Sequence, residues 1–239
     1  RRSSDLIKKL PDKGFKEYGD LGLAYFIARN LPEAISMNRK ALEIKPDYIF
    51  SWMTLGDIYY QQRDYENTNM AYSRIIELNN SVDYRLKRAQ LKMSVKSYKE
   101  AINDLEVILK SDECHIIALQ MLINCYSALK NFRNAEKLCS RLIGCNPNSG
   151  YFSRANFYLH TEKYQKAVDD FTEGLKYNRD DPMALFLRAQ AYYQLENFEK
   201  ALSDIKKVRQ LLLSIPENQR QIDIEKVEVM IVECEKLVK

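Results

Sequence analysis

Small, aromatic and apolar side chains recur along this chain at intervals close to 34 residues. The prolines show the interval first, because Pro11, Pro46, Pro147, Pro182 and Pro216 are separated by 35, 101, 35 and 34 residues. Three columns share this register: a small residue at Gly22, Gly56, Ala89, Ala155 and Ala189, a tyrosine at Tyr25, Tyr59, Tyr126, Tyr158 and Tyr192, and an alanine at Ala34, Ala101, Ala135, Ala167 and Ala201. Self-similarity at such a period indicates stacked supersecondary units.

Each unit is predicted to form two antiparallel helices, here called helix A and helix B. A small residue on helix A lets helix B approach closely, and the alanine on helix B fits the matching slot. Proline near each boundary ends one helix and can begin the next. The chain contains only 7 glycines and 6 prolines. So few turn residues favour an all-α fold over a sandwich or barrel.

The columns resemble the tetratricopeptide repeat. The second repeat shows the likeness best, with Trp52, Leu55, Gly56, Tyr59 and Tyr72. The resemblance implies a right-handed α-solenoid, or superhelix, of six helix-turn-helix repeats with a C-terminal capping helix. The predicted ranges are 1–14 for the tail of a preceding repeat helix, 15–48, 49–81, 82–115, 116–147, 148–181 and 182–215 for repeats 1 to 6, and 216–239 for the capping helix. The tail leads us to expect a segment of a longer multi-repeat protein.

Two positions in the repeat change together. Repeats 3, 5 and 6 carry arginine before the small residue and aspartate sixteen residues later, whereas repeats 1, 2 and 4 carry leucine at the first position and no charge at the second. This correlation predicts a salt bridge between helices A and B of one repeat, at Arg88 and Asp104, Arg154 and Asp170, and Arg188 and Asp204. An anionic ligand on these arginines is the weaker alternative, because each has a matched carboxylate.

By resemblance to the family, the A helices line a concave groove. One column there offers side-chain amides, which can donate to and accept from a peptide backbone. Aromatic side chains beside them would supply pockets for partner side chains. The predicted peptide-binding residues are Gln90, Asn124, Asn156, Gln190, Phe152, Phe186, Tyr193, Tyr60 and Phe26. A polar groove that simply faces water is the alternative.

Some family members hold chaperone C-termini with a carboxylate clamp of lysines, asparagines and an arginine. The matching positions here are Gly19, Leu23, Thr54, Asp83 and Lys87 in repeats 1–3, and Gln120, Asn124, Ser153, Met183 and Leu187 in repeats 4–6. Because these residues cannot supply the clamp, no chaperone carboxylate clamp is expected.

The C-terminal stretch from Asn218 to Lys239 lacks the small-residue columns. It keeps an apolar stripe at Ile224, Val227, Ile231, Cys234 and Val238, with glutamates at Glu225, Glu228, Glu233 and Glu235. This pattern is typical of a solvating helix that caps the last repeat. A partner-binding or coiled-coil helix is the alternative, although the stripe is short for a coiled coil.

Charge and cysteine content narrow the function classes. The net charge is +4, with basic and acidic residues interleaved, so nucleic-acid binding is not expected. No apolar run is long enough to span a bilayer, and the N-terminal residues lack the apolar core of a signal peptide. The five cysteines are odd in number and include no CxxC, which predicts core thiols, no disulfide framework and a cytoplasmic setting.

Catalytic chemistry has little support in the sequence. There is no GxGxxG, P-loop, HExxH or nucleophile elbow, and the only histidines are His115 and His160. No cofactor or metal is therefore expected. The leading hypothesis is a non-enzymatic interaction scaffold that binds an extended peptide or a helix of a partner protein in the concave groove. The alternative is a structural element of a larger cytoskeletal or ciliary assembly, which would use its convex face.

Overall fold

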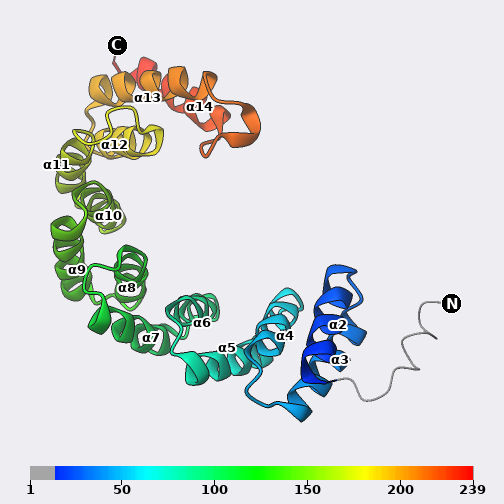
Figure 1. Cartoon of the computed structure of the whole chain (residues 1–239). Helices are drawn as coiled ribbons and strands as arrows, with labels where there is room; N and C mark the ends of the chain where they lie inside the picture. The colour runs from blue at the N-terminus through cyan, green and yellow to red at the C-terminus, as the bar shows by residue number, and fades with distance from the viewer. Residues whose placement is uncertain (1–13, 239) are drawn as a thin grey trace. The chain divides into compact units, whose positions relative to one another are not determined.

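The computed structural model describes residues 14–238, which form α-helices and one short 3-10 helix, with no strand in that range (Figure 1). The all-α repeat fold expected from the sequence is confirmed. Residues 1–13, where the tail of a preceding repeat helix is predicted, lie outside the described residues. Within 14–238, no helix is both long enough and apolar enough to cross a bilayer.

The chain divides into two compact units, Arg1–Ile108 and Leu109–Lys239, so the division falls within the predicted repeat 82–115. The helices of the first unit are α2 Phe15–Ile27, α3 Leu31–Ile44, α4 Ile49–Gln61, α5 Tyr65–Asn79, α6 Val82–Ser94 and most of α7 Tyr98–Ser111. The second unit holds α8 Ile116–Ala128, α9 Phe132–Cys145, α10 Pro147–His160, α11 Tyr164–Gly174, α12 Pro182–Gln194, α13 Phe198–Leu213, η1 Glu217–Gln219 and α14 Ile224–Leu237.

Each predicted repeat range contains one helix pair, although α10 begins at Pro147, one residue before the predicted boundary. The alanines of the helix B column, Ala34, Ala101, Ala135, Ala167 and Ala201, are all 0% exposed. Three alanines of the helix A column, Ala89, Ala155 and Ala189, are also 0% exposed. Any larger side chain at these contacts would push the two helices apart.

Every turn from helix A to helix B contains one residue in the left-handed region, and none of them is glycine. They are Arg29, Arg63, Lys96, Lys130, Glu162 and Glu196, with φ between 56° and 62°. The backbone N–H of the following residue reaches back to a carbonyl near the end of helix A, as Asn131 does to Tyr126 at 2.8 Å. This bond satisfies a carbonyl that the helix itself leaves without a donor.

The residue that follows the left-handed one often caps the next helix, which begins one residue later. The side chains of Asp64, Asn131 and Asn197 accept hydrogen bonds from backbone N–H groups of the first turn of α5, α9 and α13. Asp and Asn are favoured at this position because their oxygens satisfy a donor that has no partner within the helix. The turn therefore ends one helix and starts the next within three residues.

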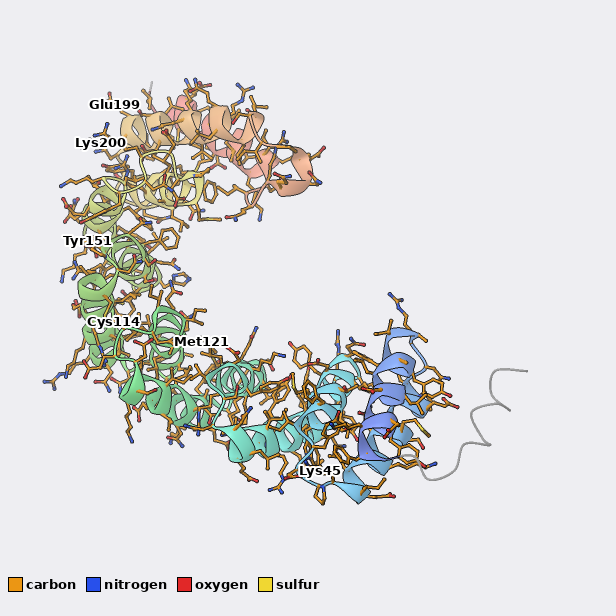
Figure 2. All side chains as sticks on the ribbon, in the orientation of Figure 1. Lys45, Cys114, Met121, Tyr151, Glu199 and Lys200 are labelled. Atoms are coloured by element: carbon orange, nitrogen blue, oxygen red, sulfur yellow. A yellow bond between two sulfur atoms is a disulfide. The ribbon has the colours of Figure 1, made fainter. Side chains whose placement is uncertain are left out.

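One prediction about the cysteines is wrong. Cys114 and Cys145 form a disulfide, with their Cα atoms 5.4 Å apart (Figure 2). Cys114 precedes α8 and Cys145 ends α9, and antiparallel pairing of these two helices brings the start of one beside the end of the other. Neither the odd number of cysteines nor the absence of a CxxC motif indicates that Cys114 and Cys145 lie close together. Disulfides persist in oxidising environments, so the bond removes the argument for a cytoplasmic setting.

The other three cysteines agree with the core-thiol expectation. Cys125, Cys139 and Cys234 carry free thiols and are each 0% exposed. Burial raises the pKa of the Cys125 thiol to about 11. Burial likewise raises the pKa of Cys139 to about 12. These side chains therefore behave as small apolar residues at neutral pH.

Candidate functional site

The three arginine–aspartate pairs join helix A to helix B within one repeat, and each is bidentate. The aspartates are almost completely buried, with 3% to 8% of their surface exposed. The distances from arginine Nε and Nη2 to the carboxylate oxygens are 2.9 and 2.5 Å for Arg88 and Asp104, 2.7 and 2.8 Å for Arg154 and Asp170, and 2.7 and 2.8 Å for Arg188 and Asp204. Two parallel hydrogen bonds set the orientation of both side chains.

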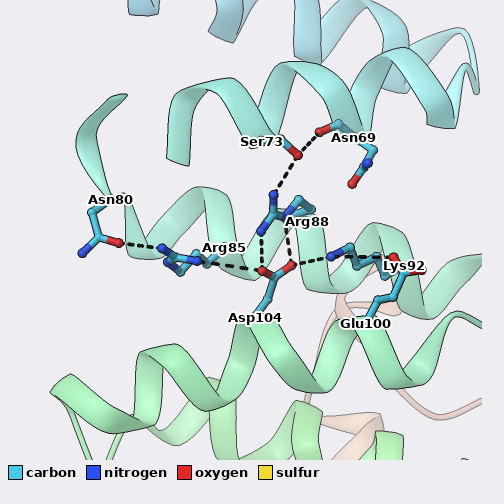
Figure 3. A network of polar contacts seen from close by, with 8 residues as sticks. All are labelled: Asn69, Ser73, Asn80, Arg85, Arg88, Lys92, Glu100 and Asp104. Atoms are coloured by element: carbon cyan, nitrogen blue, oxygen red, sulfur yellow. Dashed lines mark hydrogen bonds and ion pairs between the residues drawn. The ribbon is translucent and has the colours of Figure 1, made fainter. Parts of the chain in front are cut away.

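Asp104 is the centre of a larger network in the first unit (Figure 3). Lys92 Nζ lies 3.1 Å from Asp104 Oδ2, and Arg85 Nη1 lies 3.9 Å from Asp104 Oδ1. Arg88 also donates to Ser73 Oγ at 2.7 Å. Burial alone would raise the pKa of the Asp104 carboxyl, but the hydrogen bonds from Arg88 and Lys92 outweigh it, and the pKa is lowered. Lys92 occupies the position that holds a tyrosine in other repeats. In this repeat a cation therefore lies beside the buried Asp104 carboxylate in place of an aromatic ring.

Arg154 is enclosed by aromatic rings as well as by Asp170. Its guanidinium carbon lies 5.8 Å from the Tyr151 ring centroid and 6.0 Å from that of Tyr158. The Tyr158 hydroxyl donates to Glu136 Oε1 at 2.5 Å. Hydrogen bonding to Asp170 raises the pKa of Arg154 further above its ordinary value. The guanidinium is thus engaged on several sides by the repeat itself, which supports a structural role.

The A helices of the second unit, α8, α10 and α12, form one row, called here the A-helix face (Figure 1). A cavity of about 660 Å³ opens on this face between α8 and α10. Three side-chain amides and several aromatic rings surround it. Its lining residues are Gln120, Ile123, Asn124, Ser127, Ala128, Lys130, Phe132, Phe152, Ser153, Asn156, Phe157, His160 and Thr161.

A second cavity, of about 760 Å³, lies farther along this face, and α14 forms one of its walls. We call it the α12–α14 pocket. Helices α10, α11 and α12 supply apolar, aromatic and amide side chains, and α14 with the residue before it supplies the charged groups together with two apolar side chains. The lining residues are Leu159, Tyr164, Phe186, Gln190, Tyr193, Gln194, Asp223, Glu225, Lys226, Val229, Met230 and Glu233.

The structure divides the predicted groove residues among these places. Asn124, Asn156 and Phe152 line the cavity between α8 and α10. Phe186, Gln190 and Tyr193 line the α12–α14 pocket. The remaining predicted residues, Phe26, Tyr60 and Gln90, lie on α2, α4 and α6 of the first unit, where Tyr60 is 48% exposed and Phe26 is half-buried.

Two of the predicted aromatic residues also support the fold. The Phe152 ring meets the buried Phe171 edge-on, with centroids 5.9 Å apart. Tyr193 meets Phe198 in the same way at 5.4 Å. No aromatic contact of this kind is present for Phe186 among the described residues. Substitution at Phe186 is therefore expected to disturb packing least, which makes it the cleaner probe of the surface.

Sequence reasoning missed the contribution of α14 to the site. Of its predicted apolar stripe, Val227, Ile231 and Cys234 are buried, whereas Ile224 is half-buried and Val238 is 42% exposed. An adjoining side of the helix presents Val229, Met230 and Glu233 to the pocket. The apolar Val229 and Val232, outside the predicted stripe and 57% and 48% exposed, are the signal that could have indicated a second face.

The described residues contain no group of three or more His, Cys, Asp or Glu side chains that could hold a metal ion. His160 lines the cavity between α8 and α10, where its Nδ1 lies 2.8 Å from the Asn156 carbonyl oxygen. His115 instead caps α8, and its Nδ1 accepts from the Ala118 N–H at 3.3 Å. The groups present on the A-helix face can donate and accept hydrogen bonds and bury apolar side chains.

Comparison with known proteins places this geometry among repeat proteins. The model of a family described as anaphase-promoting complex, cyclosome, subunit 3 matches residues 128–208, about a third of the chain. DnaJ homolog subfamily C member 3 of Gallus gallus is 23% identical over 209 residues, which cover 80% of this chain and 42% of that protein. Hsp70-Hsp90 organizing protein 2 of Arabidopsis thaliana is 26% identical over 198 residues, which cover 66% of this chain and 34% of that protein.

Among solved structures, a tetratricopeptide repeat protein from Parabacteroides merdae superposes with a TM-score of 0.64 at 19% identity, covering 93% of this chain and 98% of that one. At this identity the likeness shows the fold. The chain spans less than half the length of the two curated relatives.

Proposed function

The chain is a tetratricopeptide-repeat protein, and on that premise we propose that its second unit is a non-enzymatic scaffold that binds an extended peptide or a helix of a partner protein along the A-helix face. Proteins built from this repeat generally mediate protein–protein interactions. The proposal assigns the contact to Asn124, Asn156, Gln190, Phe152, Phe186 and Tyr193 in this unit.

The observation that carries the proposal is the row of amides beside two cavities. Asn124, Asn156 and Gln190 come from three successive A helices, and each lies at the edge of a cavity that also contains aromatic rings. Side-chain amides can bond both the N–H and the C=O groups of a bound backbone. The cavities can then take up side chains of that segment, which is how an aromatic-lined pocket contributes affinity.

The test compares the intact protein with the double variant Phe186→Ala plus Asn156→Ala. Partners are captured on the immobilised protein, identified by mass spectrometry, and titrated against both forms. Loss of an aromatic anchor and an amide is expected to weaken binding about 30-fold or more. Helix content by circular dichroism should stay unchanged, because both residues lie at the surface of the cavities.

Tyr177→Ala is the matched control. Tyr177 is 60% exposed and lines neither of the two cavities on the A-helix face. Its removal deletes an aromatic side chain of similar size, and partner binding should remain within about twofold. Unaltered binding in a folded Phe186→Ala plus Asn156→Ala variant would refute the proposal.

The alternative function, a structural element of a larger assembly, would use the opposite face. A third opening of about 750 Å³ supports it, with Gln165, Asp169 and Glu173 of α11 and Lys200 of α13 in its lining. The same titration separates the two functions. Partners that bind the opposite face would be insensitive to Phe186 and Asn156 but sensitive to charge changes at Asp169 and Lys200.

A further inference from the structure

The charges of α14 divide into two sets with different surroundings. Glu228 pairs with Arg209 of α13, and Glu235 pairs with Lys206 of α13 at 2.8 Å. Glu225 and Glu233 line the α12–α14 pocket instead, and within residues 14–238 neither forms an ion pair. Glu228 and Glu235 therefore form ion pairs with α13, while Glu225 and Glu233 face the pocket.

The pocket carries more negative than positive charge. Asp223, Glu225 and Glu233 contribute three carboxylates, and Lys226 contributes the one cation of the lining. The Asp223 side chain is engaged at the start of α14, where it accepts from the Glu225 N–H at 2.9 Å. Glu225 and Glu233 are exposed and stand two helical turns apart. They are the carboxylates that a ligand can reach.

Apolar groups lie between these charges. Val229, on the turn between Glu225 and Glu233, is 57% exposed, and Met230 beside it is half-buried. Phe186 and Leu159 supply apolar surface from the facing helices. A segment that buries one aliphatic or aromatic side chain there would bring its neighbouring residues to the carboxylates.

We propose that the α12–α14 pocket selects a partner segment in which lysine or arginine stands next to a large apolar side chain. The inference rests on the proposed function and names the partner chemistry for one end of the A-helix face. The inference depends on charge complementarity. Two carboxylates, Glu225 and Glu233, on either side of the apolar Val229 favour a cationic segment and repel an acidic one. The cavity between α8 and α10 has no carboxylate in its lining and would not share this preference.

The probe is a phage-displayed library of short random peptides, selected on the immobilised intact protein. Enrichment of lysine or arginine beside an aliphatic or aromatic residue is expected on the wild type. The same selection on Glu225→Gln plus Glu233→Gln should lose the basic preference. Selection on Phe186→Ala plus Asn156→Ala should lose enrichment altogether, because that variant tests the proposed function.

The enriched peptide is then titrated by fluorescence anisotropy. Glu225→Gln plus Glu233→Gln should weaken its binding about tenfold, and raised salt should do the same for the wild type. Glu228→Gln plus Glu235→Gln is the matched control on the same helix, with the same charge change but facing α13, and should leave binding within about twofold.

The outcomes separate the two proposals. Enrichment of neutral or acidic peptides that still depend on Phe186 and Asn156 would overturn the basic preference and leave the proposed function standing. Equal weakening by the pocket-facing and α13-facing glutamine variants would also overturn the preference, because it would reflect net charge alone. A library that yields no enriched sequence on a folded wild type would overturn both.

Discussion

Arg154 and Asp170 lie sixteen residues apart, on different helices, and meet through two hydrogen bonds of 2.7 and 2.8 Å. Asp170 is 5% exposed, and the Arg154 side chain retains 24% exposure. The pair links α10 to α11 at the level where Ala155 and Ala167 let those helices approach. Removal of one partner would leave a largely buried charge without its counterion, which costs far more than the intact pair contributes.

Asp170→Ala is therefore expected to lower the free energy of unfolding by about 3 kcal/mol. The control is Glu173→Ala on the same helix, because Glu173 pairs with exposed Lys176 and should cost at most about 1 kcal/mol. Urea unfolding followed by circular dichroism measures both. Equal unfolding midpoints for the two variants would contradict the structural role of the pair.

The Asp104 network predicts a loss of stability in acid. The pKa of the Asp104 carboxyl is lowered in the folded chain, so the unfolded chain binds that proton more tightly. The carboxylate therefore contributes its full stability above the unfolded pKa of about 3.9 and loses it as the pH falls through the folded value. The melting temperature should drop below pH 4, and less steeply in Asp104→Asn, which has no carboxyl to protonate. Parallel pH profiles for the two proteins would contradict this.

The disulfide predicts sensitivity to reductant. Cys114 and Cys145 close a loop with a sequence separation of 31, and such a cross-link stabilises by about 3–4 kcal/mol on a chain-entropy estimate. Dithiothreitol should lower the melting temperature of the wild type. Cys114→Ser plus Cys145→Ser should melt at that lower temperature with or without reductant. Identical melting of the wild type in both conditions would show that the bond does not stabilise the fold.

Two glycines in neighbouring helices predict opposite effects of the same substitution. A Cβ at Gly150 of α10 would lie 2.4 Å from the backbone N and Cα of Ile143, which cannot move aside cheaply. Gly150→Ala should therefore destabilise by about 1–3 kcal/mol. A Cβ at Gly144 of α9 would meet nothing within 4 Å, so Gly144→Ala should stabilise by about 0.5–1 kcal/mol through helix propensity. Thermal melts that move in the same direction would refute the close contact of α9 and α10.

The sequence alone determined the helix pairs and the contacts that recur in register. Because every repeat has the same local geometry, the alanine column that includes Ala34 and Ala167 marks the same packing position in several repeats. The Arg88–Asp104 type of pair could be predicted for the same reason, since two positions that change together across repeats lie together in each. The buried stripe of α14 followed from its helical spacing at Val227, Ile231 and Cys234.

Only the tertiary structure decided the features that occur once. The Cys114–Cys145 bond depends on antiparallel helix ends that meet in space. The carboxylates of the α12–α14 pocket depend on how α14 is packed, because burial of Val227, Ile231 and Cys234 leaves Glu225 and Glu233 at the pocket and Glu228 and Glu235 beside α13. A single copy of a contact leaves no periodic trace, and its energy comes from neighbours distant in the chain.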